Sequence, residues 1–411
     1  MPLAGTAPPD RIRTETTVPP GAGPGLAAAD RATRNASLTL ALAQPGDTLL
    51  YLLLPLYPDA FGVSLPEAGL LLAANRLVRI AGYGWVARTY QRRGPRVSCV
   101  AAAIGAAGAA LGYALLPADV WWLLPARLMW GLSFAAMNIA VQALPTAESQ
   151  GMARRSGRSR AIVAVGPMLG LLAGAVLSGV VGPRPVFIAL AAVALVAVPF
   201  ALRLPAGKGQ PVRGSRRFAV PSRLDVWSFV QGMALDGLFV LGLGLLAREA
   251  LPDHAAIAAG LALALRYLAE ILLGPPGGVL AERFGATPLL VALSCASAAG
   301  LAAIGFGALW SGAFAIVVLR GLIQPLPAPI AAAANPGPQR VMALARLATW
   351  RDLGAGFGPL VAGLLLPLLP SAVLYSATAL LLALAALALR QTARPDSPQP
   401  RTIGTSGRKL S

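Results

Sequence analysis

Charged residues are scarce in this chain: they make up 12% of the composition, against 56% hydrophobic residues. A typical soluble domain carries about twice that share of charge, so the composition excludes an ordinary soluble fold. Histidine and cysteine are scarcer still, with 1 and 2 copies respectively. These numbers exclude a histidine-rich or cysteine-rich metal centre.

The rare residues also lie where chemistry is not expected. Cys99 and Cys295 fall within long apolar runs and have no histidine neighbours, so we expect neither a disulfide nor a metal site. His254 falls in a predicted loop, where a surface residue is favoured over a ligand or a base. The chain has no Gly-x-x-x-x-Gly-Lys-Ser/Thr loop, so ATP is not the expected energy source. We therefore expect no enzyme and no cofactor.

Long apolar runs are what the chain does have. A helix rises about 1.5 Å per residue, so about 20 apolar residues cross a hydrocarbon core of about 30 Å. Such runs predict an all-α membrane protein with twelve transmembrane helices, near residues 36–60, 67–87, 97–116, 119–144, 161–181, 184–203, 225–247, 254–280, 287–309, 311–334, 346–369 and 371–390.

The predicted spans fall into two related halves. Five pairs of landmarks recur about 190 residues apart, which indicates an internal repeat: Gly94 and Gly285, Arg79 and Glu270, Arg127 and Arg320, Pro167 and Pro359, Asp47 and Asp236. We expect two pseudo-symmetric six-helix bundles, residues 36–203 and 225–390, joined by a cytoplasmic linker at 204–224. The flanking segments 1–35 and 391–411 are polar and basic, and we expect disordered cytoplasmic tails there.

The net charge of +18 could indicate nucleic-acid binding, but its distribution excludes that. Most of the 34 lysines and arginines fall in the tails, the linker and the loops on one side of the predicted spans, and the loops on the other side hold only Arg184 and Arg248. This positive-inside bias predicts a multi-pass protein of the plasma (inner) membrane with both termini in the cytoplasm. The expected partners are the lipid bilayer, a small-molecule substrate and protons, without nucleic acid, and the chain is expected to be a monomer.

The segment Gly278–Gly285 reads Gly-Val-Leu-Ala-Glu-Arg-Phe-Gly and lies between two apolar runs. It resembles the loop signature after the second or eighth helix of the major facilitator superfamily of transporters. Glu282, Arg283 and Gly285 fill the acid, arginine and glycine positions of that signature. The resemblance covers most of the chain, residues 36–390.

The first-half copy of this loop is degraded. It contains Arg92, Arg93 and Gly94, but Gln91 stands where the family has an acid and Ala87 where it has a glycine. The acid normally braces the N-terminus of a neighbouring helix. We therefore expect the inner gate of this half to depart from the family pattern.

Arg127 is followed four residues later by Gly131, and this resembles the fourth-helix pattern of the family. The resemblance implies an arginine in the translocation path that is tied to proton coupling. The alternative is an arginine that snorkels to the outer membrane interface.

Gly166, Pro167 and Gly170 resemble the fifth-helix motif Gly-Pro-x-x-Gly, which the family associates with antiporters. Proline bends a helix, and glycines on one face let another helix approach closely. The eleventh span repeats the motif with Gly358 and Pro359, so the motif is a weaker sign of antiport here than it would be in one half alone.

The resemblance implies a secondary transporter that works by alternating access. Similarity to the efflux branch of the family (drug:proton antiporter-like) favours a proton-coupled exporter of a small molecule. An ionised carboxylate within the membrane must face a cavity, pair with a cation or take up a proton. The mid-span candidates for proton coupling are Asp47, Asp236 and Glu270. The alternative role for each of them is a structural ion pair.

Mid-span arginines outnumber these acids, which leaves a second hypothesis open. Arginine offers a bidentate fork to carboxylates and phosphates, so the same fold could serve uptake or exchange of a small organic anion. The candidates for the substrate cavity are Arg76, Arg79, Arg127, Arg266, Arg320, Asn75 and Gln324. Arg76 and Arg79 are expected to answer Asp47 and Asp236 across the cavity. Gln324 precedes a run of alternate prolines that should break the tenth span, and such breaks often mark a binding site.

Gate or conformational roles are assigned to the loop motifs, the Gly-Pro motifs and one acid of the eleventh span: Arg92, Arg93, Gly94, Glu282, Arg283, Gly285, Gly166, Pro167, Gly358, Pro359 and Asp352. Two latches are predicted on the inner side. Asp352 would pair with Arg92 or Arg93, and Glu282 would face the start of the fifth span near Arg158.

Overall fold

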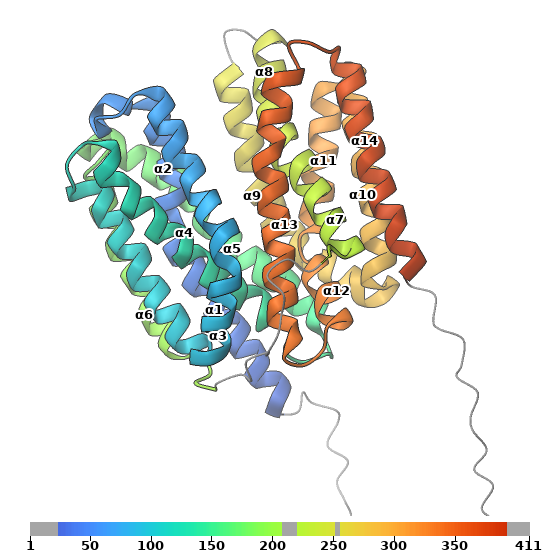
Figure 1. The fold of residues 1–411 in the computed structure, drawn as a ribbon, viewed down its shortest axis with the longest axis horizontal. Helices are drawn as coiled ribbons and strands as arrows, with labels where there is room; N and C mark the ends of the chain where they lie inside the picture. The colour runs from blue at the N-terminus through green and yellow to red at the C-terminus, as the bar shows by residue number, and fades with distance from the viewer. Residues whose placement is uncertain (1–23, 208–219, 251–254, 393–411) are drawn as a thin grey trace, which may run out of the picture.

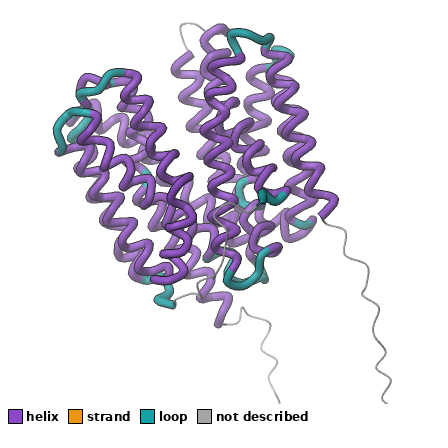
Figure 2. The backbone as a smooth tube through the Cα atoms, viewed as in Figure 1, coloured by secondary structure: helices purple, strands orange, loops and turns teal. Residues whose placement is uncertain are grey.

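The computed structural model describes residues 24–207, 220–250 and 255–392. Within these ranges the chain consists of helices joined by loops, and no strand is present (Figure 2). The predicted fold class, an all-α protein whose apolar helices form two six-helix halves, is confirmed.

The first half contains six predicted spans. The first span is broken at Gln44 into two helices, and the second and third share one long helix that departs from helical geometry at Gly94, where φ is 82°. The elements are α1 (Pro24–Ala43), α2 (Pro45–Leu56), the 3-10 helix η1 (Pro58–Phe61), α3 (Leu65–Leu115), α4 (Val120–Ala143), α5 (Met152–Val181) and α6 (Val186–Leu202).

The second half repeats this plan with two irregular spans. The seventh span includes a π-helix, and the tenth is interrupted at the proline run, as the sequence predicts. The elements are α7 (Arg223–Gln231), the π-helix η2 (Gly232–Leu238), α8 (Phe239–Ala250), α9 (Ala255–Phe284), α10 (Ala286–Gly305), α11 (Leu309–Ile323), α12 (Pro327–Ala334), α13 (Gln339–Leu365), α14 (Ser371–Leu387) and the 3-10 helix η3 (Ala388–Thr392).

Length and composition agree with a membrane location. Within the described ranges, seven helical stretches are long and apolar enough to cross a bilayer. One of them, α3, is 51 residues long and holds two of the predicted spans. The remaining predicted spans are not among these seven. Their helices are interrupted, are short, or carry too many charged residues to count as apolar over the length needed to cross a bilayer.

Several helices extend beyond the apolar runs that predict them. α1 begins at Pro24, so residues 24–35 are helical rather than part of a disordered tail, and α5 begins at Met152, well before the predicted span 161–181. Backbone hydrogen bonding continues past the hydrocarbon boundary, whereas composition marks only the apolar part of a helix. The rest of the predicted N-terminal tail, most of the predicted linker and most of the C-terminal tail lie outside the described residues.

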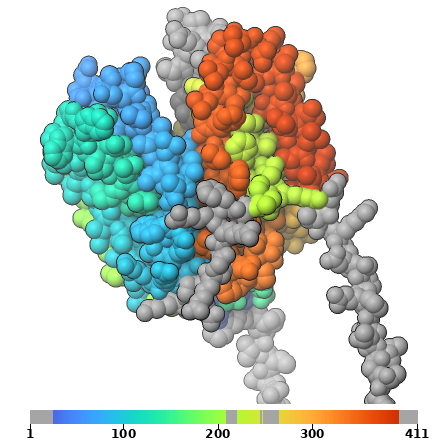
Figure 3. Space-filling view, in the orientation of Figure 1, coloured from blue at the N-terminus to red at the C-terminus, as the bar shows by residue number. Residues whose placement is uncertain are grey.

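The two halves form two bundles that converge at one end and diverge at the other (Figure 1). We call the end at which α1 begins and α14 ends the terminal side. In the space-filling view a notch separates the bundles on the opposite side (Figure 3). On the terminal side α5 meets α9 so closely that a methyl group added to Gly157 would lie 2.3 Å from the backbone oxygen of Gly274.

Glycines hold each bundle together in an equivalent way. A methyl group at Gly166 of α5 would lie 2.0 Å from the oxygen of Ala41 in α1, and one at Gly354 of α13 would lie 2.0 Å from the oxygen of Phe229 in α7. Small residues at such crossings let helix backbones approach within van der Waals contact. The Gly-Pro segments of α5 and α13 are therefore packing faces in the same place of both halves.

Replacing Gly354 by alanine should destabilise the protein, because the new methyl group overlaps the α7 backbone. Overpacking of this kind costs about 1–3 kcal/mol. The matched control is Gly363→Ala on the same helix, where nothing lies within 4 Å of the added methyl group. We expect a lower thermal unfolding midpoint for Gly354→Ala and an unchanged or higher one for Gly363→Ala. Equal midpoints for the two variants would contradict the packing argument.

Candidate functional site

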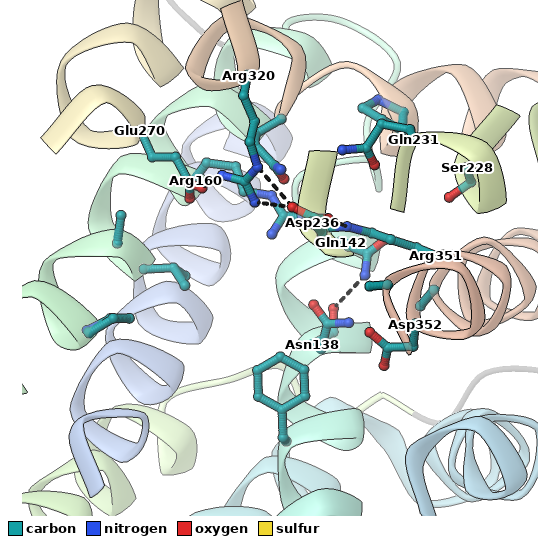
Figure 4. A pocket seen from close by; sticks show the side chains of 18 of the residues that line it. Asn138, Gln142, Arg160, Ser228, Gln231, Asp236, Glu270, Arg320, Arg351 and Asp352 are labelled. Atoms are coloured by element: carbon teal, nitrogen blue, oxygen red, sulfur yellow. Dashed lines mark hydrogen bonds and ion pairs between the residues drawn. The ribbon is translucent and has the colours of Figure 1, made fainter. Parts of the chain in front are cut away.

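A cavity of about 360 Å³ lies between the two bundles. Its wall is built by helices of both halves and is unusually rich in charge. The charged groups are six arginines and four carboxylates: Arg76, Arg79, Arg160, Arg266, Arg320, Arg351, Asp47, Asp236, Glu270 and Asp352. Figure 4 shows and labels the part of this wall that holds Arg160, Arg320, Arg351, Asp236, Glu270, Asp352 and Gln231. A volume of this size suits a small molecule.

Asp236 is the centre of the second-half cluster. It lies on the π-helix η2, a geometry that often occurs at functional sites. Nε and Nη2 of Arg320 both lie 2.8 Å from its Oδ1, and Nε and Nη2 of Arg351 both lie 3.0 Å from its Oδ2. Each carboxylate oxygen thus accepts from one guanidinium fork, an arrangement of strong charge-assisted hydrogen bonds.

Arg320 also ties Glu270 to this cluster, because its Nη1 donates to the Glu270 carboxylate. Arg266, one turn earlier on α9, is held loosely: its nearest contacts to Glu270 and to Asp236 are both 3.9 Å long. With its amide oxygen turned toward the guanidinium groups, Gln324 accepts from Arg320 at 2.9 Å and from Arg351 at 3.0 Å. Arg320 therefore bridges Asp236 and Glu270, and the Gln324 amide oxygen is a third, uncharged acceptor for its guanidinium.

Asp47 lies in the first turn of α2 and pairs with Arg127 of α4. Arg127 is 0% exposed, its Nε donates to the oxygen of Leu71 at 3.0 Å, and Asn75 donates to Asp47 at 3.4 Å. Arg127 and Asn75 are thus buried behind the cavity wall. The snorkelling alternative for Arg127 is wrong, and Asp47 is answered by Arg127 rather than by the arginines of the second span.

Asp352 of α13 reaches across to the first bundle. Its carboxylate lies 3.0 Å from Nε of Arg79 and accepts a hydrogen bond of 3.2 Å from Tyr83. Asn138 of α4 in turn donates to the Tyr83 hydroxyl at 3.1 Å. Nearby, Arg76 donates to the backbone oxygen of Ala355. Asp352 is therefore both a cavity residue and a bridge between bundles.

The predicted pairing of Asp352 with Arg92 or Arg93 does not form. Both arginines are exposed at the end of the first part of α3. The reason is depth: α13 begins at Gln339, so Asp352 lies several turns inside the helix, at the level of Arg79.

On the terminal side, an ion pair and hydrogen bonds join the two bundles. Glu282 at the end of α9 lies 3.1 Å from the Arg154 guanidinium and accepts from the Arg154 backbone N–H at 3.2 Å. It thus faces the start of α5, as predicted, but its partner is Arg154 rather than Arg158. Gln91, in place of an acid, donates to the oxygen of Pro338 at 2.7 Å.

Each loop motif turns at a glycine with positive φ, 82° at Gly94 and 85° at Gly285. Arg283 is exposed beside Phe284, with its guanidinium 5.2 Å from the ring centre. Pro167 lines the cavity, whereas Gly358 packs against η2, where an added methyl group would lie 2.4 Å from the oxygen of Met233.

Sequence reasoning missed two arginines of the cavity. Arg160 lies just before the predicted span 161–181, and Arg351 lies near the start of the predicted span 346–369, yet both line the wall. The signal that could have found Arg160 is its position directly before an apolar run. Within the described residues, no cluster of three or more histidine, cysteine or acidic side chains could hold a metal ion.

The sequence model described as Major Facilitator Superfamily matches residues 36–252 and 228–410 of the chain. No curated protein matches the sequence of this chain.

Solved structures share the fold. The human organic anion transporter MFSD10 (TETRAN) has a TM-score of 0.73 and 17% identity, over 88% of this chain and 99% of that chain. The E. coli fucose:proton symporter FucP has a TM-score of 0.68 and 14% identity, over 88% and 98%. The proton:xylose symporter XylE has a TM-score of 0.67 and 14% identity, over 89% and 96%. At these identities the likeness concerns the fold alone.

Breaking the Asp47–Arg127 pair should strongly destabilise the protein, because either single change leaves one buried charge unanswered. The expected loss for Asp47→Asn or Arg127→Gln is about 3–5 kcal/mol. The double variant should lose less than the sum of the two single losses. The measurement is the free energy of unfolding of the purified protein in a double-mutant cycle. Additive losses would show that the two side chains are not coupled.

Proposed function

Because the chain belongs to the Major Facilitator Superfamily and is a multi-pass transporter rather than an enzyme, we propose that it is a proton-coupled exporter of a small molecule that works by alternating access between its two bundles. The observation that carries the proposal is the position of Asp352. This carboxylate lines the cavity and at the same time pairs with Arg79 of the other bundle. Taking up a proton removes its charge, so proton binding and separation of the bundles become linked.

We place both termini in the cytoplasm. Exposed arginines gather on the terminal side, as expected for the cytoplasmic face of a membrane protein: Arg92, Arg93, Arg158 and Arg283. In this orientation the bundles are closed toward the cytoplasm and the cavity faces outward.

In this outward-facing state, protons reach the cavity from outside the cell. A proton that enters from outside through the open cavity neutralises Asp352 and weakens its bond to Arg79. The cytoplasmic side then opens more easily, the proton leaves inward, and cargo can bind from the cytoplasm. A return to the outward state reforms the ion pair and releases the cargo outside. Proton entry is thereby exchanged for cargo export.

A second candidate, uptake or exchange of a small organic anion, is favoured by one observation. The cavity wall carries six arginines against four carboxylates, an excess that attracts anions and repels cations. This candidate keeps the fold and the alternating-access cycle and differs in the cargo and its direction.

Asp352→Asn should favour opening on the cytoplasmic side, because it removes the charge that attracts Arg79 across the bundles. A loss of about 1 kcal/mol shifts such an equilibrium about fivefold. The reporter is a cysteine at Gln142, a buried cavity residue, in a variant with Cys99 and Cys295 replaced by alanine. We expect faster labelling by an impermeant maleimide from the cytoplasmic face, measured in inside-out vesicles.

In the protein that retains Asp352, labelling at Gln142→Cys should also become faster as the pH is lowered, relative to a cysteine in an exposed loop, because a proton on Asp352 weakens its bond to Arg79. The matched control is Asp59→Asn, which removes an exposed carboxylate of η1. It should leave both the rate and its pH dependence unchanged. If Asp352→Asn labels at the parent rate and keeps the parent pH dependence, Asp352 is not the proton-linked latch and the proposal fails.

A further inference from the structure

We propose that Arg160 completes a binding site for a small organic dianion, which is held between α5 of the first bundle and the Asp236–Glu270 cluster of the second. The inference deepens the proposed transport function, and rests on it, by naming the class of cargo.

Arg160 is a cation without a partner. It lines the cavity, yet no hydrogen bond or ion pair reaches its guanidinium from any residue that the structure describes. The other arginines of the wall differ in this respect, since each has a carboxylate or a backbone oxygen within 4 Å. A guanidinium within the membrane that has no hydrogen-bond or ion-pair partner carries a large free-energy cost. An anionic ligand would supply the missing partner.

Charged groups of the second bundle lie near Arg160: Arg320, Arg351, Glu270 and Asp236. Figure 4 shows Arg160 beside Glu270 and Arg320. The cluster formed across the two bundles contains four guanidinium groups and two carboxylates: Arg160, Arg266, Arg320, Arg351, Asp236 and Glu270.

This cluster has two positive charges more than it has negative ones. In surroundings of low dielectric, an unbalanced charge is strongly unfavourable, so the ligand that balances the site carries two negative charges. Carboxylate and phosphate groups fit best, because arginine binds both through two parallel hydrogen bonds. The cavity volume of about 360 Å³ restricts the ligand to a small molecule.

Within this cluster Arg160 and Arg266 are the arginines least committed to a partner. No hydrogen bond or ion pair from a described residue reaches the Arg160 guanidinium. Arg266 has an Nε without a hydrogen-bond partner, and its ion pairs are 3.9 Å long. Arg320 and Arg351 are already occupied by Asp236. The least committed arginines thus come from both bundles, one from α5 and one from α9, and a dianion between them would bridge the bundles.

The position of Arg160 makes this bridge sensitive to the state of the transporter. It lies one turn beyond Gly157, where α5 touches α9, and a methyl group at Gly274 would be 3.7 Å from its Cβ. Rocking of the bundles about this contact changes the distance between Arg160 and the second-bundle cluster. The bound dianion therefore favours one arrangement of the bundles over another.

The test is a thermal-shift and binding titration of the purified full chain at constant ionic strength set with chloride. The probes are succinate and glycerol 3-phosphate as dianions and butyrate as a monoanion. We expect both dianions to raise the unfolding midpoint above that in chloride, and butyrate to have a smaller effect. Arg160→Gln should raise the dianion Kd about tenfold or more, the loss expected for a hydrogen bond to a charged group. Arg160→Lys should recover part of the affinity.

The matched control is Arg158→Gln, which removes the same charge from an exposed position of the same helix and should keep the dianion affinity. Without ligand, Arg160→Gln should unfold near the midpoint of the unchanged protein, because no hydrogen bond or ion pair with a described residue is lost. A midpoint near that of the parent is the check that the variant folds. The inference is overturned if no dianion stabilises the protein more than butyrate does, if Arg160→Gln binds as tightly as the parent, or if Arg158→Gln loses as much affinity.

Failure of this inference can be told from failure of the proposed function. Labelling at Gln142→Cys reports the Asp352 latch in the absence of any ligand. If dianions do not bind while the Asp352-dependent labelling persists, the cargo class is wrong and the transport cycle stands. If the labelling loses its dependence on Asp352 while dianions still bind through Arg160, the proton-linked cycle is wrong and the site stands.

Discussion

Charge placed in a membrane-embedded interior must be answered by opposite charge, and this constraint shapes the centre of the protein. Asp236 is held between two arginine forks, and Asp47 is held by a fully buried arginine. Among the described residues, the partners of the Asp352 carboxylate, Arg79 and Tyr83, belong to the other bundle. Because each of these groups depends on its partner, adding or removing one charge alters how the helices fit together.

The two halves use this constraint differently, although they are related by an internal repeat. In the first half, Asp47 lines the cavity, but its partner Arg127 is buried behind the cavity wall. In the second half, the equivalent residues Arg320 and Asp236 stand in the wall itself. The arginine of the central pair is therefore withdrawn from the cavity in the first half, whereas in the second half both members of the pair line it.

The sequence predicts the helices and the repeat well because both depend on composition along the chain. Long apolar runs indicate spans, and landmarks at a constant offset indicate equivalent positions, such as Arg127 and Arg320. The pairing of those residues was not predictable in the same way. Depth can be estimated from position within a run, but the direction in which a side chain leaves its helix depends on packing between helices.

Residues at the ends of the runs show the limit most clearly. Arg160 lies just outside the predicted span 161–181, although the helix around it begins at Met152. Asp352 was assigned to the inner edge for the same reason, and so to the wrong partner. A charged residue near the end of a helix shortens the apolar run that can be recognised in the sequence. The predicted end of the span therefore falls at the charged residues that line the cavity.

α13 joins the two kinds of chemistry found in the cavity. Arg351 belongs to the cluster around Asp236, and its neighbour Asp352 forms the bridge to Arg79. Gly354 packs closely against the α7 backbone, which ties α13 to the second bundle. In the proposed cycle, a proton on Asp352 and an anion near Arg351 therefore act on the same helix. Coupling between the two sites then needs no longer pathway, because the residues are adjacent in the chain and both face the interface between the bundles.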